Sequence, residues 1–269
     1  MAVITRISAQ KKHKDRYNIY IDRGSGEEFG FGVSEDVLIT FALAKGKEID
    51  EVEWREILFE DEVKKAFNMA VNFLSYRMRS VNEIQEYLKK KEFADEVSAQ
   101  VVERLKRLRY IDDEEFAKMF VESRKRSSSK GPVAIKQELK KKGVPEQETA
   151  EALDRFTEEE QIAAAVRSAE KLAKRHRKKS NADMKRSIMQ TLVGKGFSRD
   201  VIEAALNQAE LEKGEDEEWA ALEAEAEKAD RRFGKYEKWE YKQRMKQHLY
   251  RKGYPMPLIE RYLSNNESE

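Results

Sequence analysis

The spacing of hydrophobic residues changes once along the chain, near residue 60. Before this point apolar and polar residues alternate in three short runs, around Ile4 to Ile7, Tyr17 to Ile21 and Phe29 to Val33. A period of two is typical of β-strands, and Gly24-Ser25-Gly26 between the last two runs predicts a hairpin. A short helix is expected to follow from Ser34. Residues 1–60 are therefore predicted to form a small β-rich module.

Beyond residue 61 the period becomes about 3.6, which predicts helices, and a motif recurs four times. Its copies are EIQEYLKKKEF (83–93), AIKQELKKKGV (134–144), SIMQTLVGKGF (187–197) and RMKQHLYRKGY (244–254). The aligned leucines are Leu88, Leu139, Leu192 and Leu249, which are spaced 51, 53 and 57 residues apart. An apolar residue precedes each leucine by four positions, so that both lie on one face of a helix. Each copy is predicted to be the middle helix of a three-helix unit.

Capping signals flank these helices. Ser80 with Glu83 and Thr157 with Glu160 predict capping boxes. The later three copies carry a glycine where a helix ends in a left-handed residue, namely Gly143, Gly196 and Gly253. Glu92 stands at this position in the first copy, so that helix is expected to end in a different cap.

The predicted fold is mainly α, with tandem three-helix repeats in an elongated array after the β-rich module. A trio of short helices buries little apolar surface alone, so neighbouring units should pack on one another. The predicted units are residues 1–60 for the module, 61–111, 112–156, 157–212 and 213–264 for the first to fourth repeats, and 265–269 for a frayed tail.

Composition excludes several classes of function. The chain has 269 residues without cysteine, and 39% are charged. No apolar run is long enough to span a membrane, and no signal peptide opens the chain, which predicts a cytoplasmic protein. The three histidines (His13, His176 and His248) lack ligand spacing, and no phosphate-binding glycine loop or catalytic constellation occurs. We therefore expect a binding protein that is not an enzyme, with no metal and no cofactor.

Charge is segregated along the chain although Lys+Arg 53 and Asp+Glu 52 nearly cancel. Basic runs cover 124–142, 171–186 and 231–252, and an acidic segment covers 210–230. Such runs are either solvated faces that pair between repeats, or a positive stripe suited to phosphates or an acidic protein groove. Ser127-Ser128-Ser129 interrupts the first run and indicates a loop or linker.

One lysine recurs three residues after each core leucine, at Lys91, Lys142, Lys195 and Lys252. Two interpretations remain open. A cation in the last turn complements the helix dipole, with its stem on apolar surface. Alternatively, the lysines make a repeated contact to a partner.

Three strings in fixed order resemble a known family. They are RMRSVNEIQEYLKKKEF (77–93), YIDDEEFAKMFVESR (110–124) and GPVAIKQELKKKGV (131–144). Together they resemble the signature of the RecX regulatory proteins, which modulate the RecA recombinase. The similarity covers roughly residues 61–263, and the β-rich start with a fourth repeat looks like the longer form of the family.

The resemblance implies a monomeric, non-enzymatic protein that binds the RecA filament on single-stranded DNA. It would restrain ATP hydrolysis and strand exchange, or promote filament disassembly, in homologous recombination, DNA repair and the SOS response. The predicted filament contacts, taken from the motifs and the first basic run, are Arg77, Arg79, Arg124, Lys130, Lys136 and Lys142. Guanidinium groups suit carboxylates and phosphates, which favours the three arginines.

Direct contact with DNA stays open beside this interpretation. Its candidate phosphate contacts lie in the third repeat, at Arg175, Arg177, Lys178 and Lys179. The alternative function is therefore a protein that binds single- or double-stranded nucleic acid without RecA.

Overall fold

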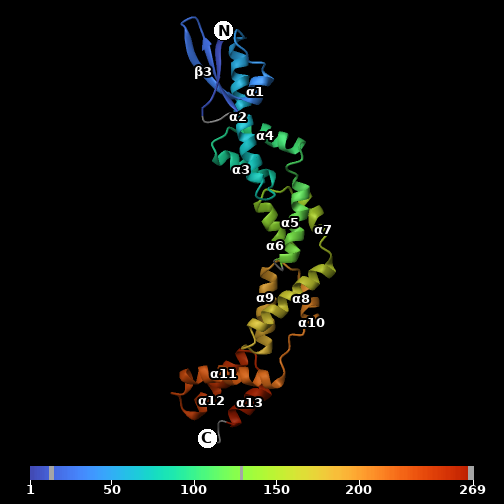
Figure 1. Ribbon diagram of the computed structural model, residues 1–269. Helices are drawn as coiled ribbons and strands as arrows, with labels where there is room; N and C mark the ends of the chain where they lie inside the picture. The colour runs from blue at the N-terminus through green and yellow to red at the C-terminus, as the bar shows by residue number, and fades with distance from the viewer. Residues whose placement is uncertain (12–14, 128–129, 266–269) are drawn as a thin grey trace. The chain divides into compact units, whose positions relative to one another are not determined.

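The computed structural model describes residues 1–11, 15–127 and 130–265, and the side chain of Ser127 is outside this description. It is mainly α-helical after a small N-terminal antiparallel sheet (Figure 1). The predicted fold class is therefore confirmed. His13, the end of the predicted Ser127–Ser129 loop and residues 266–269 of the predicted frayed tail lie outside the described residues.

The sheet holds four antiparallel strands in the order β3-β2-β1-β4. The strands are β1 (Ala2–Ala9), β2 (Arg16–Asp22), β3 (Glu27–Ser34) and β4 (Glu48–Ile49), with α1 (Glu35–Thr40) after β3. The alternation places Ile4, Ile19 and Ile21 in a shared core with Phe31. The β2–β3 hairpin is confirmed: Gly24 and Gly26 have φ of 103° and 105° there, conformations that glycine adopts easily.

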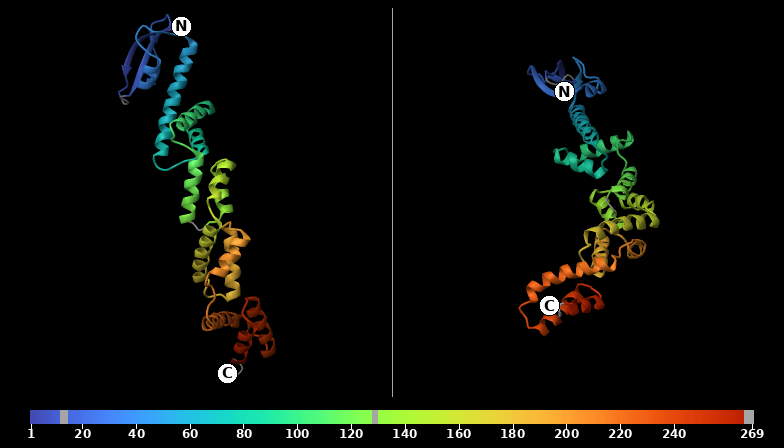
Figure 2. Two further views of the ribbon diagram at one scale, coloured as in Figure 1. Left: turned by 90° about the vertical axis from the view of Figure 1, so that its right-hand side faces the viewer. Right: turned by 60° about the horizontal axis from the view of Figure 1, so that its bottom comes forward.

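Helix α2 (Glu51–Leu74) crosses the expected boundary at residue 60 without a break, as the left view of Figure 2 shows. Its first half packs Ile57 against the sheet, and its second half contributes Ala66 and Ala70 to the first repeat. Buried Asp61 lies between the two halves. Its carboxylate forms an ion pair with Arg16 at 2.7 Å and accepts a hydrogen bond from the Ser34 amide at 2.7 Å. The module and the first repeat thus share one helix, because its apolar face serves both cores.

Twelve helices build the four repeats in order along the described chain. They are α2, α3 (Val81–Lys90) and α4 (Asp95–Arg107); α5 (Asp113–Ser127), α6 (Pro132–Lys141) and α7 (Glu146–Asp154); α8 (Glu158–Arg175), α9 (Asn181–Gly194) and α10 (Arg199–Gln208); α11 (Glu215–Phe233), α12 (Lys238–Arg251) and α13 (Met256–Asn265). The four aligned leucines are each 0% exposed, which confirms that they are equivalent core positions. Both predicted capping boxes are present.

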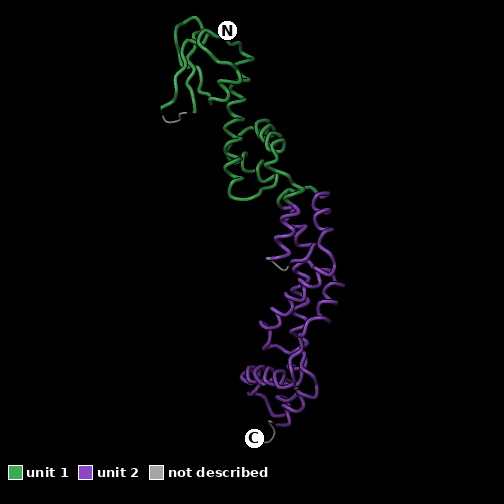
Figure 3. Tube along the Cα trace, turned by 45° about the vertical axis from the view of Figure 1, so that its right-hand side comes forward, with its two compact units in different colours: residues 1–116, 142–145 green, residues 117–141, 146–269 purple. Residues whose placement is uncertain are grey.

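Compact packing divides the chain into two units (Figure 3). The first comprises residues 1–116 and 142–145, and the second comprises 117–141 and 146–269. Residues 142–145, the loop after α6, thus pack with the first repeat although they belong to the second. This loop begins the site described next.

Candidate functional site

The loop after each later middle helix docks on the start of the preceding middle helix. We call residues 142–143, 195–196 and 252–253 the Lys-Gly loops. In each, the lysine carbonyl accepts a hydrogen bond from the residue just before the preceding middle helix: Ser80 Oγ to Lys142 O at 2.6 Å, Gly131 N to Lys195 O at 2.8 Å, and Ser180 Oγ to Lys252 O at 2.5 Å. The repeats are therefore joined by one recurring polar junction.

The glycines make this close approach possible. Gly143, Gly196 and Gly253 have φ of 69°, 83° and 87°, as predicted for helix ends. A Cβ on Gly196 would also lie 2.4 Å from the backbone nitrogen of Ala134, and one on Gly143 would lie 2.4 Å from Asn82 Cβ. The neighbouring repeat therefore requires glycine at these positions, where the left-handed helix end already favours it.

The first repeat corrects the prediction of a different cap. Glu92 takes the same left-handed conformation, with φ of 65°. The amide of Phe93 bonds the carbonyl of Leu88 at 3.3 Å, as Phe197 bonds Leu192 at 3.3 Å. The cap is therefore the same, because the hydrogen bonds that end the helix outweigh the strain of placing a side chain at positive φ.

Glu83 gathers two predicted contact residues at the first junction. Its carboxylate accepts hydrogen bonds from Arg77 at 2.7 Å and from Lys142 at 2.9 Å, and it completes the capping box with Ser80. Burial acts to raise the pKa of Glu83, but the hydrogen bonds from Arg77, Lys142 and Ser80 outweigh it and lower the pKa to about 2. Arg77 and Lys142 thus hold the junction together, and Arg77 keeps 45% of its side chain exposed.

Arg79 differs from its neighbour Arg77. Its guanidinium lies 3.9 Å from the ring centroid of Phe73, which stacks on Tyr87 at 4.0 Å and 7°. Its Nε is buried without a hydrogen-bond partner, and no carboxylate pairs with it among the described residues. Burial and the nearby Arg77 charge lower the pKa of Arg79. The arrangement is a cation stacked on an aromatic pair, three residues after Tyr76 in the sequence, and Tyr76 is 78% exposed.

The predicted contacts of the second repeat all have carboxylate partners. Arg124 and Lys130 share Glu138, with Arg124 Nε at 2.6 Å, and Lys136 contacts Glu146 at 2.7 Å. Burial acts to raise the pKa of Glu138, but the bonds from Lys130 and Arg124 leave it below its usual value. The basic run is thus partly neutralised within its own repeat.

The four candidates of the third repeat separate into two pairs. Arg177 contacts Glu217 of the fourth repeat at 2.5 Å, and Lys179 contacts Asp183 at 3.2 Å. Arg175 and Lys178 are exposed and have no ion pair within the described ranges. Arg177 therefore pairs with a carboxylate of another repeat, whereas Arg175 and Lys178 remain available to bind a partner.

The recurring lysines have a role that the sequence did not indicate, because it belongs to their backbone carbonyls. Their side chains differ from repeat to repeat. Lys142 and Lys252 reach carboxylates, Glu83 and Glu225, both at 2.9 Å, whereas Lys195 reaches the hydroxyl of Ser168 at 2.6 Å. The docking signal lies in the combination of a Lys-Gly loop with a serine or glycine before the preceding middle helix, about 60 to 70 residues earlier.

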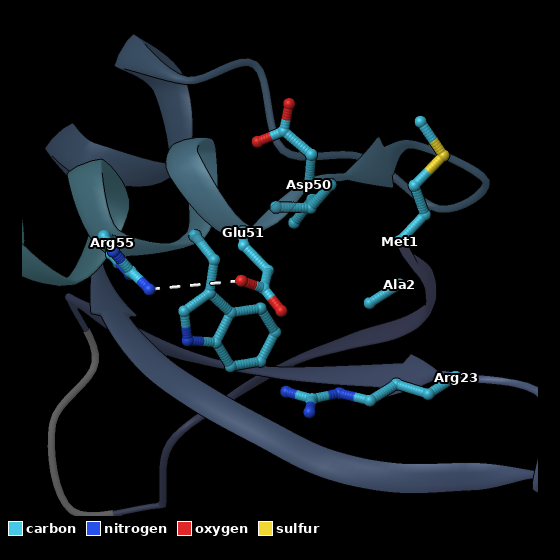
Figure 4. Close-up of a pocket in the computed structure, with 8 residues that line it drawn as sticks. Met1, Ala2, Arg23, Asp50, Glu51 and Arg55 are labelled. Carbon is cyan, nitrogen blue, oxygen red and sulfur yellow. Dashed lines mark ion pairs between the residues drawn. The ribbon is translucent and has the colours of Figure 1, made fainter.

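A hollow of 490 Å³ in the N-terminal module is lined by residues from the end of β4 and the start of α2, among them Trp54, and by Met1, Ala2 and Arg23 (Figure 4). Its polar side chains have local partners. Asp50 caps α2, Glu51 lies 3.9 Å from Arg55, and Arg23 lies over the Trp54 ring at 4.9 Å. The hollow therefore lacks a convergent set of free polar groups.

Other kinds of site are not evident in the part of the chain that the structure describes. No group of three His, Asp or Glu side chains there could hold a metal ion. None of the helices described is both long and apolar enough to cross a membrane.

Profiles of RecX domains match most of the chain. Residues 2–50 match the profile of the regulatory protein RecX N-terminal domain. Residues 66–105 and 112–153 match the first and second three-helix domains of RecX, and the third such domain matches twice, at 158–206 and 215–263.

Curated relatives match along the whole chain. Proteins named regulatory protein RecX from Bacillus licheniformis and Bacillus subtilis are each 44% identical, over 98% and 99% of this chain and 98% and 100% of their own. A crystal structure of regulatory protein RecX matches with a TM-score of 0.66 and 36% identity, over 77% of this chain and 100% of that one. RecX from Lactobacillus salivarius matches with a TM-score of 0.53 and 32% identity, over 57% and 99%. The chain therefore belongs to the RecX family of regulatory proteins.

Proposed function

We propose that this protein binds the RecA filament on single-stranded DNA and mainly inhibits its ATPase and strand-exchange activities. The observation that carries the proposal is the full-length similarity to proteins named regulatory protein RecX, including all four repeats. The protein acts as a cytoplasmic monomer and has no turnover of its own. Its effect is stoichiometric, because binding along a filament requires one protein for each stretch that is covered.

Arg79 is the strongest candidate contact among the predicted residues. Arg77, Arg124, Lys130, Lys136 and Lys142 already have carboxylate partners, so a filament must compete for them or share them. Arg79 has no such partner among the described residues, and its ring stack fixes the guanidinium in place. A preorganised arginine stacked on an aromatic ring has the features of an interface anchor.

The test is RecA ATPase on single-stranded DNA, titrated with this protein. We expect inhibition that saturates at a fixed ratio of protein to RecA. Arg79→Ala should weaken inhibition about tenfold or more, as truncation of an interface anchor does. Arg107→Ala is the matched control, since Arg107 is an exposed arginine of the same repeat without an ion pair within the described ranges.

Two results would contradict the proposal. One is an ATPase rate that stays unchanged when this protein is present in excess. The other is inhibition that persists after the protein has been removed from the reaction, since a stoichiometric regulator leaves no lasting effect.

A second function, direct binding of nucleic acid, is favoured by the cations of the third repeat that lack carboxylate partners. Arg175 and Lys178 belong to this group. Their surroundings are developed below.

A further inference from the structure

The third and fourth repeats carry the same cations at equivalent positions of the sequence. A shift of 57 residues, which aligns Leu192 with Leu249, also aligns four other positions. The corresponding pairs are Ser168 with Glu225, Lys171 with Lys228, Arg175 with Arg232, and Lys195 with Lys252. Three cations are thus kept, and one acidic position is replaced by serine.

In the fourth repeat the acidic residue neutralises this cluster. The Glu225 carboxylate contacts Lys252 Nζ at 2.9 Å and His248 Nε2 at 3.1 Å, and it lies 3.8 Å from Lys228 Nζ. Burial acts to raise the pKa of Glu225, but these bonds leave it below its usual value. A carboxylate therefore occupies the centre of the fourth-repeat cluster.

In the third repeat, Lys195 has no carboxylate partner in the part of the chain that the structure describes. Lys195 Nζ donates to Ser168 Oγ at 2.6 Å, and Ser168 is 2% exposed. Lys171 and Arg175 follow Ser168 on α8 by three and seven positions, so all three residues lie on one face of that helix.

The charges of this cluster act on one another. Burial lowers the pKa of Lys195, and the positive charges of Lys171 and Arg175 lower it further, without an opposing carboxylate. Lys171 and Arg175 are exposed and form no ion pair within residues 1–11, 15–127 and 130–265. The third repeat thus keeps three cations around a place that its homologous repeat fills with an anion.

We propose that Lys171, Arg175 and Lys195 form a phosphate-binding site that takes the backbone of a single nucleic-acid strand. The phosphate occupies the place that the Glu225 carboxylate holds in the fourth repeat, and the Ser168 hydroxyl orients Lys195. The inference rests on the second function proposed above, direct binding of nucleic acid, and assigns it a site; this binding requires no recombinase.

A strand fits this site better than a free phosphate. Lys171 and Arg175 are exposed, so one phosphate bound there remains partly in water and is held weakly. A strand brings several phosphates, and exposed Lys178 extends the positive surface beyond Arg175. Each phosphate that is neutralised releases counterions, which makes the affinity strongly dependent on salt.

The experiment measures binding of a fluorescein-labelled single-stranded oligonucleotide by anisotropy over a series of salt concentrations, without RecA. The variant is Lys171→Gln/Arg175→Gln/Lys195→Gln. We expect about tenfold weaker binding or more at low salt, and a logarithmic salt slope smaller by about 2, since each lost contact removes about 0.7. Circular dichroism checks that the helices remain.

Two further variants use the homologous repeat. Lys228→Gln/Arg232→Gln removes the cations at the equivalent positions of the fourth repeat, where Glu225 lies 3.8 Å from Lys228, and we expect binding close to that of the original protein. Ser168→Glu places a carboxylate among the third-repeat cations, and we expect a loss of binding similar to that of the triple variant while all three cations remain.

Defined outcomes overturn the proposal. The first is an unchanged affinity and salt slope in the folded triple variant. The second is an equal loss in the fourth-repeat control, which would show attraction by net charge alone. The third is displacement of the strand by inorganic phosphate, but not by chloride at equal ionic strength, which would assign the site to a free anion. Because RecA is absent, none of these results bears on inhibition of the filament.

Discussion

The loop after the first middle helix and the three Lys-Gly loops end their helices in the same way but have different neighbours. Glu92 and Gly196 both have positive φ, and both are followed by an apolar residue that bonds back to the core leucine. Gly196 then meets the backbone of Ala134 in the preceding repeat, whereas no three-helix repeat precedes Glu92. Glycine is therefore required by the junction between repeats, and helix termination alone tolerates a glutamate.

The largest effect should come from substitution of the core leucines, which are buried alike in repeats with either kind of loop. Leu88→Ala in the first repeat and Leu249→Ala in the fourth each remove a fully buried side chain. We expect both to lower the free energy of unfolding by about 2 to 5 kcal/mol. Hydrogen exchange should show opening mainly of the altered repeat and its neighbour. A leucine whose loss leaves exchange unchanged would break the equivalence of the repeats.

The second prediction distinguishes the Lys-Gly loops from the loop at Glu92. Gly196→Ala introduces a side chain at positive φ and against Ala134, so we expect a loss of about 3 kcal/mol, with faster exchange at the start of α6. Gly194→Ala is the control two residues earlier, because an added Cβ there meets nothing within 4 Å. The control should be neutral, or more stable by about 0.5 to 1 kcal/mol. Equal effects at both positions would show that the junction does not require glycine.

The third prediction concerns the charge at the first junction. The pKa of Glu83 is about 2 in the folded protein and ordinarily 4.5, so its bonds stabilise the fold above pH 4.5. This stabilisation is lost progressively as the pH falls from 4.5 to 2. Glu83→Gln should therefore be less stable than the original protein by about 2 kcal/mol at pH 7, and the difference should shrink towards pH 2. Urea denaturation at several pH values measures it, and a constant difference would exclude the charge as its cause.

The smallest effect is expected at Glu92. Glu92→Gly relieves the strain of a side chain at positive φ but increases the freedom of the unfolded chain, so the two effects nearly cancel. We expect a change within about 1 kcal/mol, measured by urea denaturation. A large loss would mean that the Glu92 side chain supports a contact of its own.

The sequence predicted the repeats because their signals are local. A leucine with an apolar residue four positions earlier defines a buried helix face, and Ser80 with Glu83 defines a helix start, without knowledge of distant residues. The continuity of α2 was missed because the same periodicity that began the first repeat already extends back to Glu51. Only the structure shows that Ile57 faces the sheet and Ala66 faces the first repeat.

The site was harder to predict because its contacts are distant in sequence. Arg77 was singled out as a contact residue, but its pairing with Glu83 competes with that role. Arg79 was distinguished from Arg77 only by contacts seen in the structure: it stacks on Phe73 and has no carboxylate partner among the described residues. The third-repeat cluster was predicted only in part. Arg175 was among the predicted phosphate contacts, Lys171 belonged to a predicted basic run, and a partner contact stayed open for Lys195. Their grouping into one site emerged only when the Lys195–Ser168 hydrogen bond was compared with the Lys252–Glu225 ion pair.

The direction of the junctions has a consequence for synthesis on the ribosome. The Ser80 hydroxyl can bond the Lys142 carbonyl only after 62 further residues have been synthesised. The Ser180 hydroxyl can bond the Lys252 carbonyl only after 72 further residues. The first three repeats can therefore form their helices as they emerge, but each is completed only when the middle helix of its successor has folded. A chain that stalls between two repeats exposes an open helix start at its growing end, so premature termination leaves the last finished repeat as the weakest part of the truncated protein.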